Sequence, residues 1–183
     1  LGDYKLLKIL NINLILSELI KTELLFNDNI SVNTSVTTTS NLKNHTFRKI
    51  NFFFNIINGK INVNKTKFII NKIGSIELGN SNIFFENSKL TLNTDIVVDI
   101  NNTDKLFSLL QTNKKFRKPI KNILINLDYV FLTNQIKINN LNIDGKDGGN
   151  ELSGISEVFI GNNLNNWNKN KRLLNRLIES YEG

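Results

Sequence analysis

The chain of 183 residues contains no cysteine and no methionine, and it has a single proline and a single histidine. Without cysteine, disulfide bonds, thiolate metal sites and thiol catalysis are excluded. No stretch approaches the roughly 20 apolar residues that a membrane-spanning helix needs. Because the chain starts with Leu1 and contains no methionine, we expect it to be a fragment that lacks its natural N-terminus, with a signal or anchor in the preceding region.

The constellations of residues that perform common enzyme chemistry are also missing. His45 is the only histidine, and no carboxylate or second histidine is close to it in the sequence. The chain has no G-x-S-x-G elbow, no phosphate-binding loop and no dinucleotide fingerprint. The acidic residues of segment 144–151 do not follow EF-hand spacing, and Asp95 and Asp99 are expected on a solvated strand face. We therefore expect no enzyme activity, no metal and no cofactor.

The net charge is +7, which indicates either attraction to phosphate or lysines spread over solvated faces. One cluster of basic residues lies near the C-terminus, in segment 169–176. The aromatic strand positions alternate with Asn and apolar residues instead of Arg, so no specific nucleic-acid partner is expected. The densest cluster supplies the candidates for binding anionic headgroups: Lys114, Lys115, Arg117 and Lys118.

Apolar residues recur at every second position through much of the chain, which predicts strands with one apolar face. Such a face must be covered by another sheet, by helices or by a ligand with acyl chains. If the ligand is a lipid, the candidate lipid-facing residues are Ile50, Phe52, Phe54, Ile56, Ile83, Phe85, Leu90, Leu92, Ile96, Val98, Ile125, Leu127 and Tyr129.

Turn signals divide the chain into short strands. Asn58-Gly59 predicts a tight hairpin, and Gly79-Asn80 and Asn87-Ser88 predict further turns. The segment 30–40 is rich in Val, Thr and Ser and is expected to form an edge strand. The remaining strands are expected at 10–16, 23–26, 50–57, 60–64, 67–71, 75–78, 81–86, 89–100, 120–132 and 135–143.

Helical spacing appears once inside the strand region and again after it. Thr103 is the expected N-cap of a helix near 103–112, and helices are expected over 152–159 and 164–181. The fold class is therefore β-rich α+β: a long curved antiparallel meander forming an apolar groove, with one inserted helix and C-terminal amphipathic helices. We divide it into N-terminal strands (1–46), a β region (47–145) and a helical segment (146–183).

Three segments have a recognisable order of elements: the hairpin of residues 56–61, the strand series of 65–100 and the helix–strand series of 105–145. Together they resemble the C-terminal region of AsmA-like proteins. The resemblance covers residues 50–145 and depends on pattern and order of elements. It implies a periplasmic protein anchored in the inner membrane, with phospholipid acyl chains as partner and with the membrane surface or outer-membrane proteins as further partners. It also implies a function in phospholipid movement or in outer-membrane assembly.

Two hypotheses follow. In the first, the alternating apolar residues face a groove that binds or conducts lipid. In the second, the chain is an elongated structural or surface module whose apolar face is sealed by a second sheet or by helices. The apolar periodicity fits both, and the resemblance favours the first.

Overall fold

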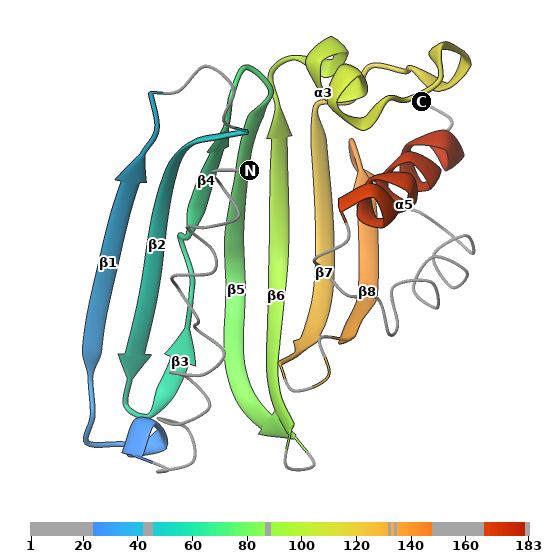
Figure 1. Ribbon diagram of the computed structural model, residues 1–183. Helices are drawn as coiled ribbons and strands as arrows, with labels where there is room; N and C mark the ends of the chain where they lie inside the picture. Colours follow the sequence, from blue (N-terminus) through green and yellow to red (C-terminus); the bar gives the residue numbers. More distant parts are fainter. Residues whose placement is uncertain are drawn as a thin grey trace.

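The computed structural model describes residues 24–41, 46–86, 89–131, 133, 135–147 and 167–181. In these ranges the chain forms one nine-stranded antiparallel sheet whose strands follow sequence order (Figure 1). The strands are β1 (Val32–Thr39), β2 (Phe47–Ile57), β3 (Lys60–Asn62), β4 (Lys67–Ile70), β5 (Gly74–Glu86), β6 (Lys89–Ile100), β7 (Asn122–Val130), β8 (Gln135–Ile143) and β9 (Lys146–Asp147).

The sequence prediction of a β-rich protein with a large antiparallel sheet is confirmed. β1 pairs with β2 along its whole length and occupies one edge of the described sheet. The sheet continues across residues 46/47 and 145/146, where the sequence analysis divides the chain, because β1 pairs with β2 and β9 pairs with β8. The strands expected over 10–16 and the helix expected over 152–159 lie outside the described residues.

The turn between β2 and β3 has the predicted form. Asn58 and Gly59 both adopt positive φ, at 48° and 69°, which is the backbone requirement of a tight two-residue hairpin. A side chain at position 59 would also lie 2.4 Å from the carbonyl oxygen of Phe26. Only glycine therefore satisfies both the backbone angle and the close approach of the neighbouring segment.

The predicted strands 75–78 and 81–86 form one strand, β5, so the expected turn at Gly79-Asn80 is wrong. The register with β6 shifts between Gly79 and Asn82, which is a β-bulge. Ser81 lies in this bulge and is buried; its N–H donates to Asn64 Oδ1 at 2.6 Å, and its hydroxyl accepts from the Val63 N–H at 2.8 Å. These bonds satisfy backbone groups that a regular ladder would have paired, so the strand bends and continues.

β2 has two partners on one side: β3 beside its second half and β4 beside its first half. Phe53 lies between these two stretches. The Thr66 hydroxyl fills the gap, because it accepts from the Phe53 N–H at 3.0 Å and donates to the Phe53 carbonyl oxygen at 3.2 Å. Thr66 is 0% exposed, so these backbone groups are paired by protein at a site that solvent does not reach.

Helical elements lie at the ends of the sheet. The expected strand 23–26 is wrong, since Leu24–Phe26 forms a short 3-10 helix, η1. Helix α3 (Thr103–Leu110) lies within the expected range, but its N-cap is Asn102, whose side chain accepts from the Lys105 N–H at 3.0 Å. Thr103 instead donates to the carbonyl oxygen of Ile120. Helix α5 (Trp167–Ser180) follows near the C-terminus.

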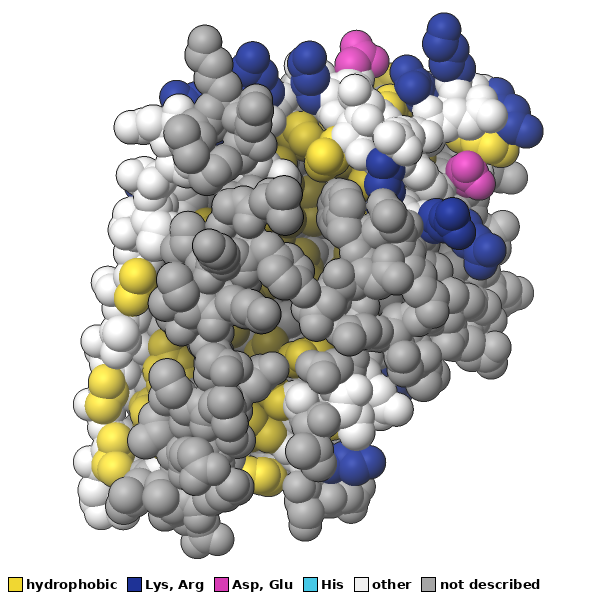
Figure 2. All heavy atoms as spheres, in the orientation of Figure 1, with side chains coloured by type: hydrophobic (Ala, Val, Ile, Leu, Met, Phe, Trp, Pro, Cys, Tyr) yellow, Lys and Arg dark blue, Asp and Glu magenta, His cyan; other side chains and the backbone are white. Residues whose placement is uncertain are grey.

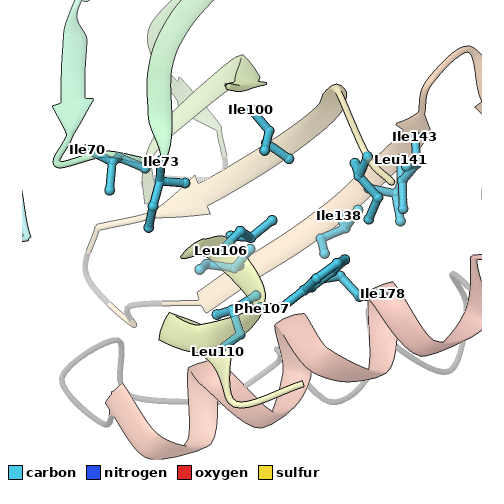
Figure 3. Packing of buried hydrophobic residues seen from close by; sticks show 12 residues of the cluster. Ile70, Ile73, Ile100, Leu106, Phe107, Leu110, Ile138, Leu141, Ile143 and Ile178 are labelled. Carbon is cyan, nitrogen blue, oxygen red and sulfur yellow. The ribbon is translucent and has the colours of Figure 1, made fainter. Parts of the chain in front are cut away.

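The buried residues form two clusters on the same side of the sheet. The larger cluster lies beneath α3 and α5, where Phe107, Leu110 and Ile178 are each 3% exposed (Figure 3). The smaller cluster lies toward η1 and includes Ile56, Ile61 and Ile83. The helical elements therefore pack against one face of the sheet at two separate places.

Candidate functional site

The strand register brings the predicted lipid-facing residues together on one face, which we call the apolar face. Ile83 lies opposite Leu92, and Leu92 lies opposite Tyr129. Ile96 likewise lies opposite Ile125. Side chains alternate between the two faces of a sheet, so the apolar residues two positions apart on each strand share this face.

The same face continues into β2. Ile56 pairs with Ile61 of β3, and Ile61 pairs with Ile83 of β5. The same face contains Ile50, Phe52 and Phe54, because they occupy every second position of the strand that leads to Ile56. The register of β8 shifts beside β7, so Ile138 and Leu141 share this face although they are three positions apart. The apolar face also contains residues that were not among the predicted lipid-facing set: Phe68, Ile76, Leu78, Ile123, Ile136, Ile138, Leu141 and Ile143.

The residues of the apolar face differ in burial. Ile56, Ile83 and Leu90 are buried, whereas most of the other candidates are half-buried. Phe85 is 48% exposed, although its ring centroid is 5.5 Å from that of Phe26 in η1. Hydrophobic side chains are visible on this side of the molecule between the other atoms (Figure 2).

Tyr129 and Phe131 form an aromatic pair at the end of β7, with ring centroids 5.0 Å apart in an edge-to-face arrangement. Burial raises the pKa of the Tyr129 hydroxyl above its ordinary value. Tyr129 packs against the cluster beneath the helices, and Phe131 packs against the cluster near η1. This pair therefore connects the two clusters along one side of the apolar face.

The opposite face of β5–β8 contains a network of Asn and Asp side chains. Asp95 accepts from Asn80 at 2.6 Å and from Asn126 at 2.7 Å. Asp128 accepts from Asn93 at 2.7 Å and from Asn139 at 3.0 Å. The prediction that Asp95 lies on the face opposite Ile96 is confirmed by these bonds. Within β5–β8, the chemistry of the two faces is therefore strongly different.

The four candidate headgroup-binding residues lie directly after α3. Lys114 and Lys115 belong to a 3-10 turn, η2 (Lys114–Phe116), and are exposed. Arg117 is also exposed, and its Nε donates to the carbonyl oxygen of Thr112 at 3.0 Å. Lys118 is half-buried. All four belong to one short connection, which ends where β7 begins.

The residues that could have supplied metal chemistry are used structurally. Asp144 Oδ1 accepts from the N–H groups of Lys121 and Asn122, and its Oδ2 accepts from the Tyr181 hydroxyl at 3.2 Å. Among the described residues there is no group of three or more His, Cys, Asp or Glu placed to hold a metal ion. His45 lies outside these ranges. In the same ranges, no helix has the length and apolar character to cross a membrane.

No family model, no curated protein and no solved structure matches this chain. A function for this chain is therefore inferred from its residues and from the arrangement of the two sheet faces.

Proposed function

We propose that this chain binds phospholipid acyl chains along its apolar face, and that it is the C-terminal segment of an AsmA-like periplasmic protein anchored in the inner membrane. Such a protein conducts phospholipid between the inner and outer membranes or supports outer-membrane assembly. The observation that carries the proposal is the continuity of the apolar face from β2 to β8, with half-buried residues such as Phe54, Leu92 and Leu127 along it.

An acyl chain on such a face exchanges contact with water for contact with apolar side chains. Each methylene group removed from water is worth about 0.8 kcal/mol, so two chains are retained without any specific polar contact. Movement along the face replaces one set of apolar contacts by an equivalent set, so each step costs little. A uniform row such as Leu78, Ile96 and Ile125, which pair across three strands, suits this kind of binding.

The arrangement of the buried clusters also supports a lipid site. Between the cluster beneath α3 and α5 and the cluster near η1 lies Ile96, which belongs to neither in the described part of the chain. Ile96 is half-buried. A lipid lying across Ile96 would contact both clusters, and this is where we place the centre of an apolar groove.

The resemblance over residues 50–145 supports the assignment to AsmA-like proteins, and with it the periplasmic location and the outer-membrane partners. A protein that retains lipid by apolar contact needs no catalytic residue or cofactor. The proposal therefore requires only the apolar face and access to it.

A sealed structural module is the second candidate, and one observation favours it. Beneath α3 and α5, Phe107, Leu110 and Ile178 are almost fully buried against the sheet. This half of the apolar face is packed like an ordinary protein core. If the other half were covered in the same way, the chain would bind no lipid.

Position-specific crosslinking separates these candidates. We place a photoreactive phenylalanine analogue at Ile96 and, as a matched control, at Val97, its neighbour on the opposite face of β6. After irradiation in a Gram-negative periplasm, we expect a phospholipid adduct at position 96 and none at position 97. No adduct at 96 would favour the sealed module, and equal adducts at both positions would show that lipid contact is not specific to the apolar face.

A further inference from the structure

Two basic segments that are far apart in the sequence meet at one end of the molecule. The first follows α3, and the second lies on α5. Thr112, just after α3, donates to Asn175 Oδ1 of α5 at 2.6 Å, and Asn175 Nδ2 donates to the carbonyl oxygen of Leu110 at 2.6 Å. Arg117 in turn contacts the carbonyl oxygen of Thr112. The basic residues beside Asn175 on α5 are therefore brought next to those that follow α3.

We call the combined surface the basic patch; it consists of Lys114, Lys115, Arg117, Lys118, Lys171, Arg172 and Arg176. Its members are exposed, apart from Lys118 and Lys171, which are half-buried. The nearest acidic residues on the two helices are Asp104 and Glu179, so the patch has a clear positive excess. Figure 2 shows Lys and Arg side chains gathered over the end of the sheet where these helices lie.

The helices that hold the basic patch turn their apolar residues toward the sheet. Leu106 and Phe107 of α3 and Ile178 of α5 are buried in the larger cluster (Figure 3). Phe116 is half-buried within the patch, and the Lys115 ammonium lies 4.5 Å from its ring centroid. The positive charges are thus held on a packed support at one end of the apolar face.

We infer that the basic patch docks this end of the chain on an anionic phospholipid surface. The inference rests on the proposed function and extends it, since it names the membrane that the end of the apolar face approaches. Each basic residue near an anionic surface strengthens binding about fivefold, which corresponds to about 1 kcal/mol. Several such residues on one rigid support are sufficient for measurable binding at moderate ionic strength.

A membrane fits this patch better than a nucleic acid does. The patch is confined to one end of the sheet. Beyond it, on the face of β5–β8 opposite the apolar face, lie Asp95, Asp99 and Asp128. A long polyanion that continued from the patch along that face would meet these carboxylates. A flat anionic surface would contact the end alone.

The test is sedimentation with vesicles of phosphatidylglycerol or phosphatidylcholine at about 0.1 M salt, where the Debye length is about 10 Å. We expect binding to the anionic vesicles only, with loss of binding at about 1 M salt. The variant Lys115→Glu/Arg172→Glu should bind at least about 30-fold more weakly. The matched control Lys60→Glu/Lys89→Glu reverses two exposed charges at the starts of β3 and β6 and should bind within about threefold of the wild type.

Lys114→Glu/Arg176→Glu repeats the test with a second pair of exposed residues, in case the first variant does not fold. Equal binding to both kinds of vesicle, or equal losses in the patch and control variants, would overturn the inference. So would tighter binding to a DNA oligonucleotide than to vesicles at the same phosphate concentration. The proposed function is judged separately, because the crosslink at Ile96 reports acyl chains on the sheet and not docking at its end.

Discussion

Thr112 and Asn175, which are 63 residues apart, share a hydrogen bond of 2.6 Å that joins the end of α3 to the middle of α5. Thr112 is only 2% exposed, so its hydroxyl has little access to water. Asn175 also binds the carbonyl oxygen of Leu110, one of the last carbonyl groups of α3. One amide side chain therefore satisfies one polar group in the last turn of α3 and one just after it, and it fixes the position of α5.

Asn175→Ala should detach α5 from α3. Removing the amide leaves the Thr112 hydroxyl and the Leu110 carbonyl group without this partner, at a cost of about 1–3 kcal/mol in the free energy of unfolding. Hydrogen exchange of α5 amides should accelerate in the variant. Arg176→Ala, at the exposed neighbouring position, is the control and should leave exchange in α5 unchanged. Equal effects from both substitutions would show that Asn175 has no special function in joining the helices.

Thr66→Val should destabilise the sheet where β2 passes from β4 to β3. Valine has nearly the same shape but cannot pair the N–H and carbonyl groups of Phe53. We expect a loss of about 2–3 kcal/mol in urea unfolding, because two buried backbone groups lose their partner. Thr66→Ser keeps the hydroxyl and should be clearly more stable than Thr66→Val. If the two variants were equally stable, the hydroxyl would not be the reason for threonine here.

The sequence predicts strands well where local signals and tertiary pairing agree. Asn58-Gly59 has the backbone freedom that its hairpin requires, and the alternation of β6 and β7 matches their actual faces. Local signals fail where a distant partner decides the outcome. Gly79-Asn80 has the composition of a turn, yet the Asn64 side chain accepts from the Ser81 N–H, the Ser81 hydroxyl accepts from the Val63 N–H, and β5 continues through a bulge.

The helical elements show the same limit. Asn102 and Thr103 are both good N-cap residues, and Thr103 is used instead to bind the carbonyl oxygen of Ile120, which the sequence alone does not reveal. For the candidate site, alternation predicts which residues share a face. It does not predict that Thr112 and Asn175 bring the two basic segments together, because that contact depends on the packing of α5 on the sheet.

Gly74→Ala should be far more disruptive than Gly79→Ala, although both glycines are in β5. A Cβ atom at position 74 would lie 1.8 Å from the carbonyl oxygen of Asp99, whereas at position 79 nothing lies within 4 Å. The clash is with backbone of the paired strand, so relief requires β5 and β6 to separate. We expect a loss of about 3 kcal/mol or more for Gly74→Ala, measured by urea unfolding, and a change below about 1 kcal/mol for Gly79→Ala. Similar losses at both positions would contradict the close approach at Gly74.

Stability should fall at alkaline pH through Tyr181. Partial burial, the hydrogen bond to Asp144 and the charge of that carboxylate all raise the pKa of the Tyr181 hydroxyl. A group whose pKa is raised by folding stabilises the native state below its unfolded pKa, which is about 10 for tyrosine. This contribution is lost as the pH rises through the higher folded pKa. Ultraviolet titration of phenolate should therefore show a smaller late transition in Tyr181→Phe than in the wild type, because only Tyr129, whose pKa is raised by burial, still contributes to it. An unchanged titration curve in the variant would contradict this assignment.

Whether the apolar face holds lipid can be measured by comparing substitutions at Leu127 and Leu124. Both are half-buried residues of β7; Leu127 lies on the apolar face, and Leu124 lies on the opposite face beside Val97. The measurement is mass spectrometry of organic extracts from the wild-type chain, Leu127→Asp and Leu124→Asp, each purified from a Gram-negative periplasm and shown to be folded. We expect stoichiometric phospholipid in the wild type and in Leu124→Asp, and its loss in Leu127→Asp. A folded, monodisperse wild-type chain without lipid would contradict lipid binding on the apolar face and indicate a sealed structural module.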